Sequence, residues 1–212
     1  MAAQLRQYGV RGAVAALVAA AALVLAGCGS GSSGSVAGST PSDPGGSTMA
    51  SSTAPAAAAP LARSVPARLR IPAIGVDASV MQVGLNSDGT VGVPPIEANA
   101  PAAWYDGSPT PGQTGPSVIL GHVTVGSYGD GVFLHLSRLH PGDQVEVTLQ
   151  DGATAVFRVD SVQTVVKSTF PTNAVYGNVD HPALRLITCG GPHLSGGGYP
   201  DNVIVYASLS GS

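Results

Sequence analysis

Two side chains of this sequence are suited to covalent catalysis. Cys189 follows the predicted strand 184–188 and is itself followed by two glycines, so we expect its thiol at the rim of a sheet, where a substrate can approach. His122 is placed in the same way, after the apolar run 118–120 and Gly121. A thiol needs a nearby base or cation to react as a nucleophile, because a free cysteine is only a few per cent thiolate at neutral pH. The pair therefore predicts acyl transfer through an intermediate bound to sulfur.

The other cysteine and the other histidines are interpreted differently. Cys28 ends an apolar N-terminal run, which leaves Cys189 as the one thiol of the chain's body. An unpaired cysteine is unusual in an exported protein, because the compartments outside the cytoplasm oxidise thiols. The alternative to a catalytic Cys189 is a cysteine that serves as a small, buried apolar residue. Four histidines lie in turns, loops or a predicted short helix and are expected to have no catalytic role: His135, His140, His181 and His193.

The segments that must position this pair are predicted to be β-strands. Residues 144–149 alternate polar and apolar side chains, as a half-buried strand does, and an Asp-Gly hairpin turn follows at 151–152. Residues 132–139 could form a short amphipathic helix. Many short strands at close spacing favour an all-β sandwich or barrel. The predicted strands are residues 68–71, 79–83, 117–120, 144–149, 154–159, 161–166, 184–188 and 202–207.

The composition excludes several classes of function. The chain has 212 residues, 10% charged side chains and a formal net charge of −3, and it contains no basic run. A nucleic-acid partner would require a basic face for its phosphates, so none is expected. The acidic residues are scattered singly instead of being grouped as oxygen ligands, so we expect no metal and no cofactor.

The first 27 residues predict export. Arg6 and Arg11 precede the uncharged apolar run 12–27, a pattern typical of a signal peptide. The run is short for a membrane span, which needs about 20 residues. The run ends in the letters LAGC at Cys28, which resembles the lipobox of bacterial lipoproteins, whose cysteine is diacylated. This resemblance implies a signal peptide over residues 1–27 and a body lipid-anchored at the extracytoplasmic face of the membrane. The alternative is a plain membrane anchor whose last residue happens to be cysteine.

Residues 28–63 are predicted to be a disordered linker. Gly, Ser, Ala, Thr and Pro dominate it, with too few large apolar side chains to offset the entropy of ordering. At about 5–6 Å times the square root of the residue number, such a tether has a root-mean-square reach of about 30–35 Å. The folded body is therefore expected over residues 64–212.

The order of the motifs resembles that of the sortases, the cysteine transpeptidases of Gram-positive cell walls. The triplet GHV at residues 121–123 precedes LRLITC at 184–189, and a VIVYA strand follows at 203–207. The flanking segments 103–105 and 111–116 resemble those of actinobacterial class F and class E sortases. Across nearly all of the body, the resemblance implies an eight-stranded β-barrel with short helices.

The resemblance also implies a mechanism and its partners. Cys189 would attack the Thr–Gly carbonyl of an LPXTG-like sorting signal on a secreted protein and form an acyl-enzyme. His122 would protonate the leaving amine and then deprotonate the incoming amine of a peptidoglycan precursor. The lipid on Cys28 would hold the enzyme at the membrane where these partners meet.

Two positions depart from the family's pattern. Sortases generally carry an arginine at the start of the last strand, where this chain has Asn202, whose amide could donate to a developing oxyanion. Arg185 is the alternative, although four residues of strand, about 13 Å, separate it from Cys189. In a third interpretation, Asn202 only caps the strand and backbone N–H groups stabilise the oxyanion. Thr124 stands where relatives often have aspartate, which leaves His122 without an acidic neighbour.

Three other functions remain open on the sequence alone. An L,D-transpeptidase is also exported, β-rich and dependent on cysteine, but Thr188-Cys189-Gly190 lacks its Ser-x-Gly-Cys-x-Arg pattern. The missing arginine would suit a non-catalytic, wall-associated lipoprotein with a degenerate sortase barrel. A sortase-type hydrolase would cleave the signal without transferring it to an amine.

Replacing Cys28 by serine tests the predicted anchor. We expect Cys28→Ser to abolish incorporation of an alkyne-labelled fatty acid in cells, because the acceptor sulfur is gone. Cys189→Ser, which keeps Cys28, is the matched control and should label like the unmodified chain. Unchanged labelling of Cys28→Ser would rule out the lipobox.

Overall fold

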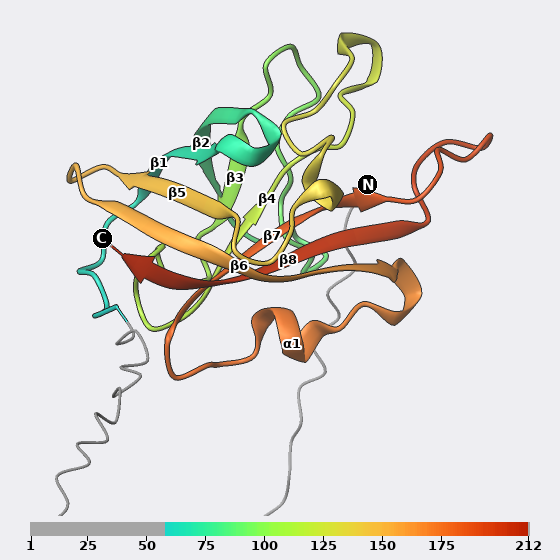
Figure 1. Ribbon diagram of the computed structural model, residues 1–212. Coiled ribbons are helices and arrows are strands. Elements are labelled where there is room, and N and C mark those ends of the chain that lie inside the picture. The colour runs from blue at the N-terminus through green and yellow to red at the C-terminus, as the bar shows by residue number, and fades with distance from the viewer. Residues whose placement is uncertain (1–57, 212) are drawn as a thin grey trace, which may run out of the picture. The chain divides into compact units, whose positions relative to one another are not determined.

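The strands of this protein close into one β-barrel (Figure 1). The computed structural model describes residues 58–211. Eight strands follow the order β1-β2-β3-β4-β7-β8-β6-β5 around the barrel, and only short helices join them, so the predicted all-β fold is confirmed. The predicted signal peptide (1–27), Cys28 and nearly all of the predicted linker (28–63) lie outside the described residues.

The elements are short and closely spaced. The strands are β1 (Pro66–Ile71), β2 (Val76–Val83), β3 (Ala102–Tyr105), β4 (Gly115–Leu120), β5 (Gln144–Leu149), β6 (Thr154–Val166), β7 (Pro182–Gly190) and β8 (Asp201–Gly211). The helices are α1 (Thr172–Tyr176) and the 3₁₀ turns η1 (Pro72–Ile74), η2 (Gly126–Tyr128), η3 (Leu136–Arg138) and η4 (Lys167–Thr169). No helix within residues 58–211 is long and apolar enough to cross a membrane.

The eight strands are not the eight predicted runs, although the number agrees. The runs 154–159 and 161–166 form the single strand β6, because Asp160 lies at a register shift of the β6–β8 ladder and not in a turn. Strand β3 is absent from the predicted set; its sequence AAWY is short and half alanine, a weak strand former. The predicted helix at 132–139 is reduced to the 3₁₀ turn η3.

Large apolar side chains fill the barrel, and a smaller cluster covers part of its outside. Successive strand residues point to opposite faces, so alternate residues of β5 are buried. A second cluster joins Val175 of α1 to the outer faces of β4, β7 and β8, and Figure 1 shows α1 outside the barrel. The largest fully buried side chains include Trp104, Phe133, Phe157, Leu69, Ile71, Ile119, Leu136, Leu184 and Leu186.

The pairing that positions the predicted catalytic pair is the parallel ladder between β4 and β7. Residues Gly115 to Leu120 lie opposite Pro182 to Ile187, each residue facing the one 67 positions later. Continued past the end of β4, the same offset would bring His122 level with Cys189. Because neighbouring strands lie about 4.8 Å apart, this register brings both residues to one rim of the barrel.

Two hydrogen bonds extend this pairing beyond the end of β4. The Gly121 amide donates to the Ile187 carbonyl at 3.1 Å. The buried Thr188 hydroxyl donates to the Gly121 carbonyl at 2.8 Å. The backbone is therefore fixed up to the residue that precedes His122.

Strands β8 and β6 bring further residues to the same row. Cys189 lies opposite Asn202 on β8, which lies opposite Val165 on β6. Lys167 follows Val165 by two residues, and its amide donates to the Pro200 carbonyl at 3.1 Å, so the ladder geometry continues past the end of β6. The two-residue period of a strand then directs the Lys167 side chain to the face that carries the thiol.

We expect Thr188→Val to loosen this rim. The substitution keeps the shape of the side chain but removes the donor to the Gly121 carbonyl, and a buried acceptor without a partner costs about 1–3 kcal/mol. Thr164→Val, at an exposed position of β6, is the matched control and should change the free energy of unfolding by less than about 0.5 kcal/mol. Urea denaturation measures both; equal stabilities would mean that this bond does not hold the rim.

Candidate active site

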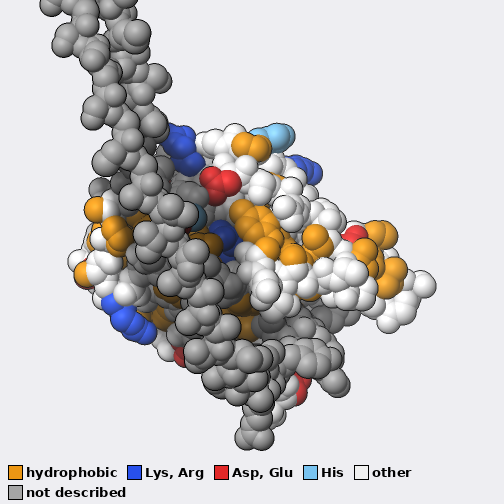
Figure 2. All heavy atoms as spheres, turned by 90° about the horizontal axis from the view of Figure 1, so that it is seen from below, with side chains coloured by type: hydrophobic (Ala, Val, Ile, Leu, Met, Phe, Trp, Pro, Cys, Tyr) orange, Lys and Arg blue, Asp and Glu red, His pale blue; other side chains and the backbone are white. Residues whose placement is uncertain are grey.

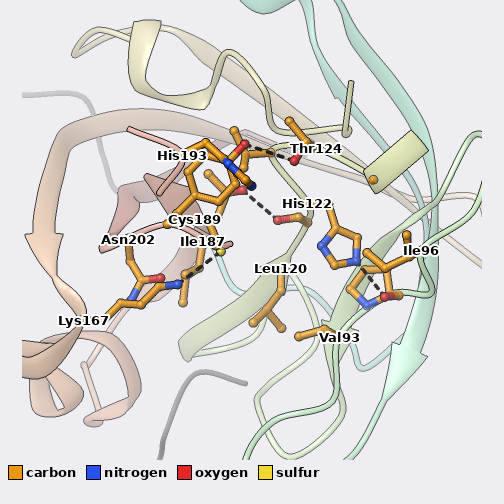
Figure 3. Close-up of a pocket in the computed structure, with 17 residues that line it drawn as sticks. Val93, Ile96, Leu120, His122, Thr124, Lys167, Ile187, Cys189, His193 and Asn202 are labelled. Carbon is orange, nitrogen blue, oxygen red and sulfur yellow. Dashed lines mark hydrogen bonds between the residues drawn. The ribbon is translucent and has the colours of Figure 1, made fainter. Parts of the chain in front are cut away.

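A pocket of about 270 Å³ opens where β4 and β7 end and β8 begins (Figure 3). Part of its wall is apolar and includes Val93, Ile96, Leu120 and Ile187. Its polar lining includes His122, Thr124, Lys167, Cys189 and Asn202. The predicted nucleophile, the predicted acid–base residue and one of the two predicted oxyanion donors therefore share one pocket.

The Cys189 thiol is half-buried and lines this pocket. It forms no disulfide with any described residue. The ammonium of Lys167 donates to the sulfur at an Nζ–Sγ distance of 3.6 Å, and Figure 3 shows this contact as a dashed line. Among the described residues that line the pocket, the one with a permanent charge therefore lies against the predicted nucleophile.

The His122 ring reaches the pocket but is not hydrogen-bonded to the thiol in the described structure. Its Nε2 lies 2.7 Å from the Pro94 carbonyl oxygen. A carbonyl oxygen only accepts, so Nε2 carries a proton and donates. In the view of Figure 3 this bond points away from the sulfur. Nδ1 is therefore the nitrogen available for proton exchange.

A backbone carbonyl takes the place of the acidic neighbour that His122 lacks. The Thr124 hydroxyl lies 3.1 Å from the Tyr199 hydroxyl and is not hydrogen-bonded to the His122 imidazole in the described structure. Tyr199 in turn stacks edge-on with His193, with 5.1 Å between ring centroids. The buried Pro94 supplies the carbonyl that fixes the orientation of the His122 ring, as the third member of a catalytic triad does.

Asn202 lines the pocket beside the predicted nucleophile. It lies directly across the β7–β8 ladder from Cys189, and the residue is only 5% exposed. Figure 3 shows its amide beside Lys167 at the edge of the pocket. A side-chain N–H at this place can donate to the oxygen of a carbonyl that the thiol attacks.

Arg185 does not line the pocket. Its guanidinium donates to the Ala174 carbonyl of α1 at 3.4 Å and to the Leu184 carbonyl at 3.1 Å, and it lies 4.8 Å from the centre of the Tyr206 ring. Burial lowers the pKa of the Arg185 guanidinium, and Tyr206 opposes this shift. These contacts connect α1 to the barrel, and they place the positive charge of Arg185 outside the pocket.

Sequence reasoning missed Lys167 and Pro94. Lys167 is the only lysine of the chain, and it follows the predicted strand 161–166 directly. Its position at a strand end is visible in the sequence, but the pairing of that strand with β8 is not. Pro94 lies in the long connection between β2 and β3, where no periodicity indicates which carbonyl faces the histidine.

The pocket and the surface of the described domain carry few charged side chains. Of the residues in the described part of the chain that line the pocket, Lys167 alone carries a permanent charge. Figure 2, which views the molecule from below Figure 1, shows acidic and basic side chains scattered and not gathered into a patch. No group of three or more His, Cys, Asp or Glu that could hold a metal occurs within residues 58–211.

Solved structures of sortases share this fold at low sequence identity. Sortase A from Corynebacterium diphtheriae matches with a TM-score of 0.51 and 22% identity, over 70% of this chain and 61% of that one, so this chain spans less than two thirds of its length. A sortase D5 transpeptidase from Clostridium perfringens matches with a TM-score of 0.50 and 21% identity, over 68% and 78% of the two chains. Sortase C-1 from Actinomyces oris gives 0.50 and 20%, over 68% and 72%.

The sequence itself carries the family assignment. No curated protein sequence matches the chain. The family model of the sortase domain, in contrast, matches residues 69–210, well over half of the chain. These comparisons do not favour the L,D-transpeptidase or the non-catalytic alternative. The protein belongs to the sortase family.

Proposed function

We propose that this protein is a cysteine transpeptidase that cleaves an LPXTG-like sorting signal of secreted proteins and transfers the acyl part to an amine of a peptidoglycan precursor. One observation carries the proposal: the half-buried Cys189 thiol shares a pocket with His122, and a lysine ammonium lies 3.6 Å from its sulfur. Membership of the sortase family supports the class of reaction.

The first half-reaction forms a thioester on Cys189. The thiolate attacks the carbonyl carbon of the scissile bond, a C–S bond forms, and the π electrons move to the carbonyl oxygen. The Asn202 amide donates a hydrogen bond to this oxyanion. As the C–N bond breaks, His122 gives a proton to the leaving amine.

The second half-reaction transfers the acyl group to an acceptor. His122 takes a proton from the incoming amine as its nitrogen attacks the thioester carbonyl. A C–N bond forms, the C–S bond breaks, and the thiolate of Cys189 is regenerated. Water in place of the amine gives hydrolysis of the signal.

Two features of the pocket support this scheme. The Pro94 carbonyl accepts from His122 Nε2 throughout, which holds the ring in one orientation while Nδ1 exchanges the proton. The apolar wall that includes Ile96 and Ile187 suits the leucine and proline of an LPXTG-like signal.

The proposed place of action is the extracytoplasmic face of a Gram-positive membrane. The LAGC sequence supports a lipid anchor on Cys28, and the composition of residues 28–63 supports a tether that lets the catalytic domain reach the wall. The flanking segments 103–105 and 111–116 support a class F or class E sortase.

Cleavage and ligation of a peptide test the reaction. We expect the full-length protein in detergent to release the C-terminal fragment of an LPXTG-like peptide and to join the N-terminal fragment to an added amine, both measured by liquid chromatography and mass spectrometry. Cys189→Ala should abolish both products without changing the circular dichroism spectrum, because no nucleophile remains. His122→Ala should lower kcat by about 10²–10⁴.

The control is His140→Ala, which removes an exposed histidine in a turn and should leave kcat within about twofold of the original. Turnover by Cys189→Ala would remove the proposal. A drop under about tenfold for His122→Ala would exclude it as the acid–base residue. Cleavage without ligation would identify a hydrolase.

The two predicted oxyanion donors are expected to respond differently to substitution. Asn202→Ala should lower kcat by about 10²–10³ with little change in KM, because it removes a donor to the oxyanion. Arg185→Met should instead lower the midpoint of thermal unfolding, because it breaks the contacts to α1. Steady-state kinetics and calorimetry measure both. A change under about twofold in Asn202→Ala, with a large loss of kcat in folded Arg185→Met, would reverse the assignment.

A further inference from the structure

We propose that Lys167 supplies the fixed positive charge of this active site, in place of the arginine that the family's pattern puts at the position of Asn202. The inference rests on the proposed role of Cys189 as the nucleophile. It makes Lys167 a catalytic residue, because its ammonium touches the reacting sulfur.

The backbone holds Lys167 in position. It is the first residue of η4, and its amide donates to the Pro200 carbonyl at 3.1 Å, which continues the β6–β8 ladder. From there its half-buried side chain extends past Asn202 toward Cys189. Figure 3 shows Nζ and Sγ facing each other across the start of β8.

The charge of Lys167 is not used by another partner in the described part of the chain. No carboxylate of residues 58–211 lies within salt-bridge distance of Nζ; the ion pairs found there involve Arg68, Arg70 and His181. The one side-chain hydrogen bond of Lys167 goes to the sulfur of Cys189. An ammonium placed in a half-buried pocket without a carboxylate is suited to an anion that forms there during the reaction.

The other candidate groups do not provide a permanent charge at the sulfur. Arg185 is only 6% exposed, and its guanidinium donates to the backbone carbonyls of Ala174 and Leu184. His122 changes its charge during the reaction, because it carries the transferred proton. Asn202 is a neutral donor.

The ammonium acts on the anion at two stages of acylation. Before the C–S bond forms, it lies against the attacking sulfur. As the C–S bond forms, the negative charge moves to the carbonyl oxygen, and the flexible lysine stem with its three N–H donors can follow it. Lysine gives up no proton, because His122 protonates the leaving amine. Lys167 therefore adds a charge to the neutral hydrogen bond from Asn202.

Competing alkylating reagents test this charge directly. The rate of Cys189 modification by anionic iodoacetate, divided by the rate with neutral iodoacetamide, reports the local potential and is read by mass spectrometry of the peptide that contains Cys189. At one fixed pH, we expect this ratio to fall about tenfold in Lys167→Met and to change little in Lys167→Arg, which keeps the charge. Arg138→Met removes an exposed cation outside the pocket and is the matched control.

Kinetics of peptide cleavage provide the second readout. We expect Lys167→Met to lower kcat by about 10²–10³ and to change KM by less than about threefold, since the charge acts on the transition state. Lys167→Arg should recover kcat to within about tenfold. A side chain with a merely structural role would not distinguish methionine from arginine in this way.

The two measurements keep this inference separate from the proposed function. Alkylation needs no substrate, so an unchanged iodoacetate-to-iodoacetamide ratio in Lys167→Met overturns the role of Lys167 even if the protein cleaves no peptide. Normal kcat in Lys167→Met also overturns it and leaves the transpeptidase intact. If Lys167→Met does not fold, the ratio of the folded unmodified chain is compared with that of the urea-unfolded chain, and equal ratios overturn the inference.

Discussion

The parallel pairing of β4 with β7 is the constraint on which this active site depends. Parallel strands that pair in register end at the same edge of a sheet. The backbone pairing alone therefore brings together the residues that follow the two strands, and no contact between their side chains is required. This protein places His122 and Cys189 at that edge, and the Thr188–Gly121 bond fixes the backbone between them. A slip of β7 by one residue would turn the thiol toward the barrel interior.

The position of each cation on the outer face of the barrel decides which groups it contacts. Arg185 and Lys167 both belong to the outer face formed by β7, β8 and β6. Arg185 lies opposite Tyr206 and beneath α1. Lys167 lies next to the paired residues Cys189 and Asn202. Opposite charges about 4 Å apart attract by about 1 kcal/mol in water and about 4 kcal/mol at an effective dielectric constant of about 20. A half-buried pocket therefore gives a lysine–thiolate pair a strength that it would not have on an open surface.

The sequence alone could predict the all-β fold and the strand-end positions of Cys189 and His122, but not how distant strands meet. Local alternation and turn residues identify most strands, and glycines after Cys189 indicate a rim. Strand β3 was hidden because two of its four residues are alanine, and β6 was divided at Asp160, a polar residue that lies at a register shift. Lys167 is brought to the pocket by a strand pairing and Pro94 by the path of a loop, and neither leaves a periodic signal in the chain.

The central claim is that the sulfur of Cys189 carries the acyl group between two amines. Intact-mass spectrometry of the full chain, quenched in acid after mixing with a sorting peptide in the absence of acceptor, tests it most directly. The account predicts a mass increase equal to the N-terminal fragment, located on the peptide that contains Cys189 and removed by hydroxylamine. Cleavage of the sorting peptide with no adduct on Cys189 at any time would contradict it.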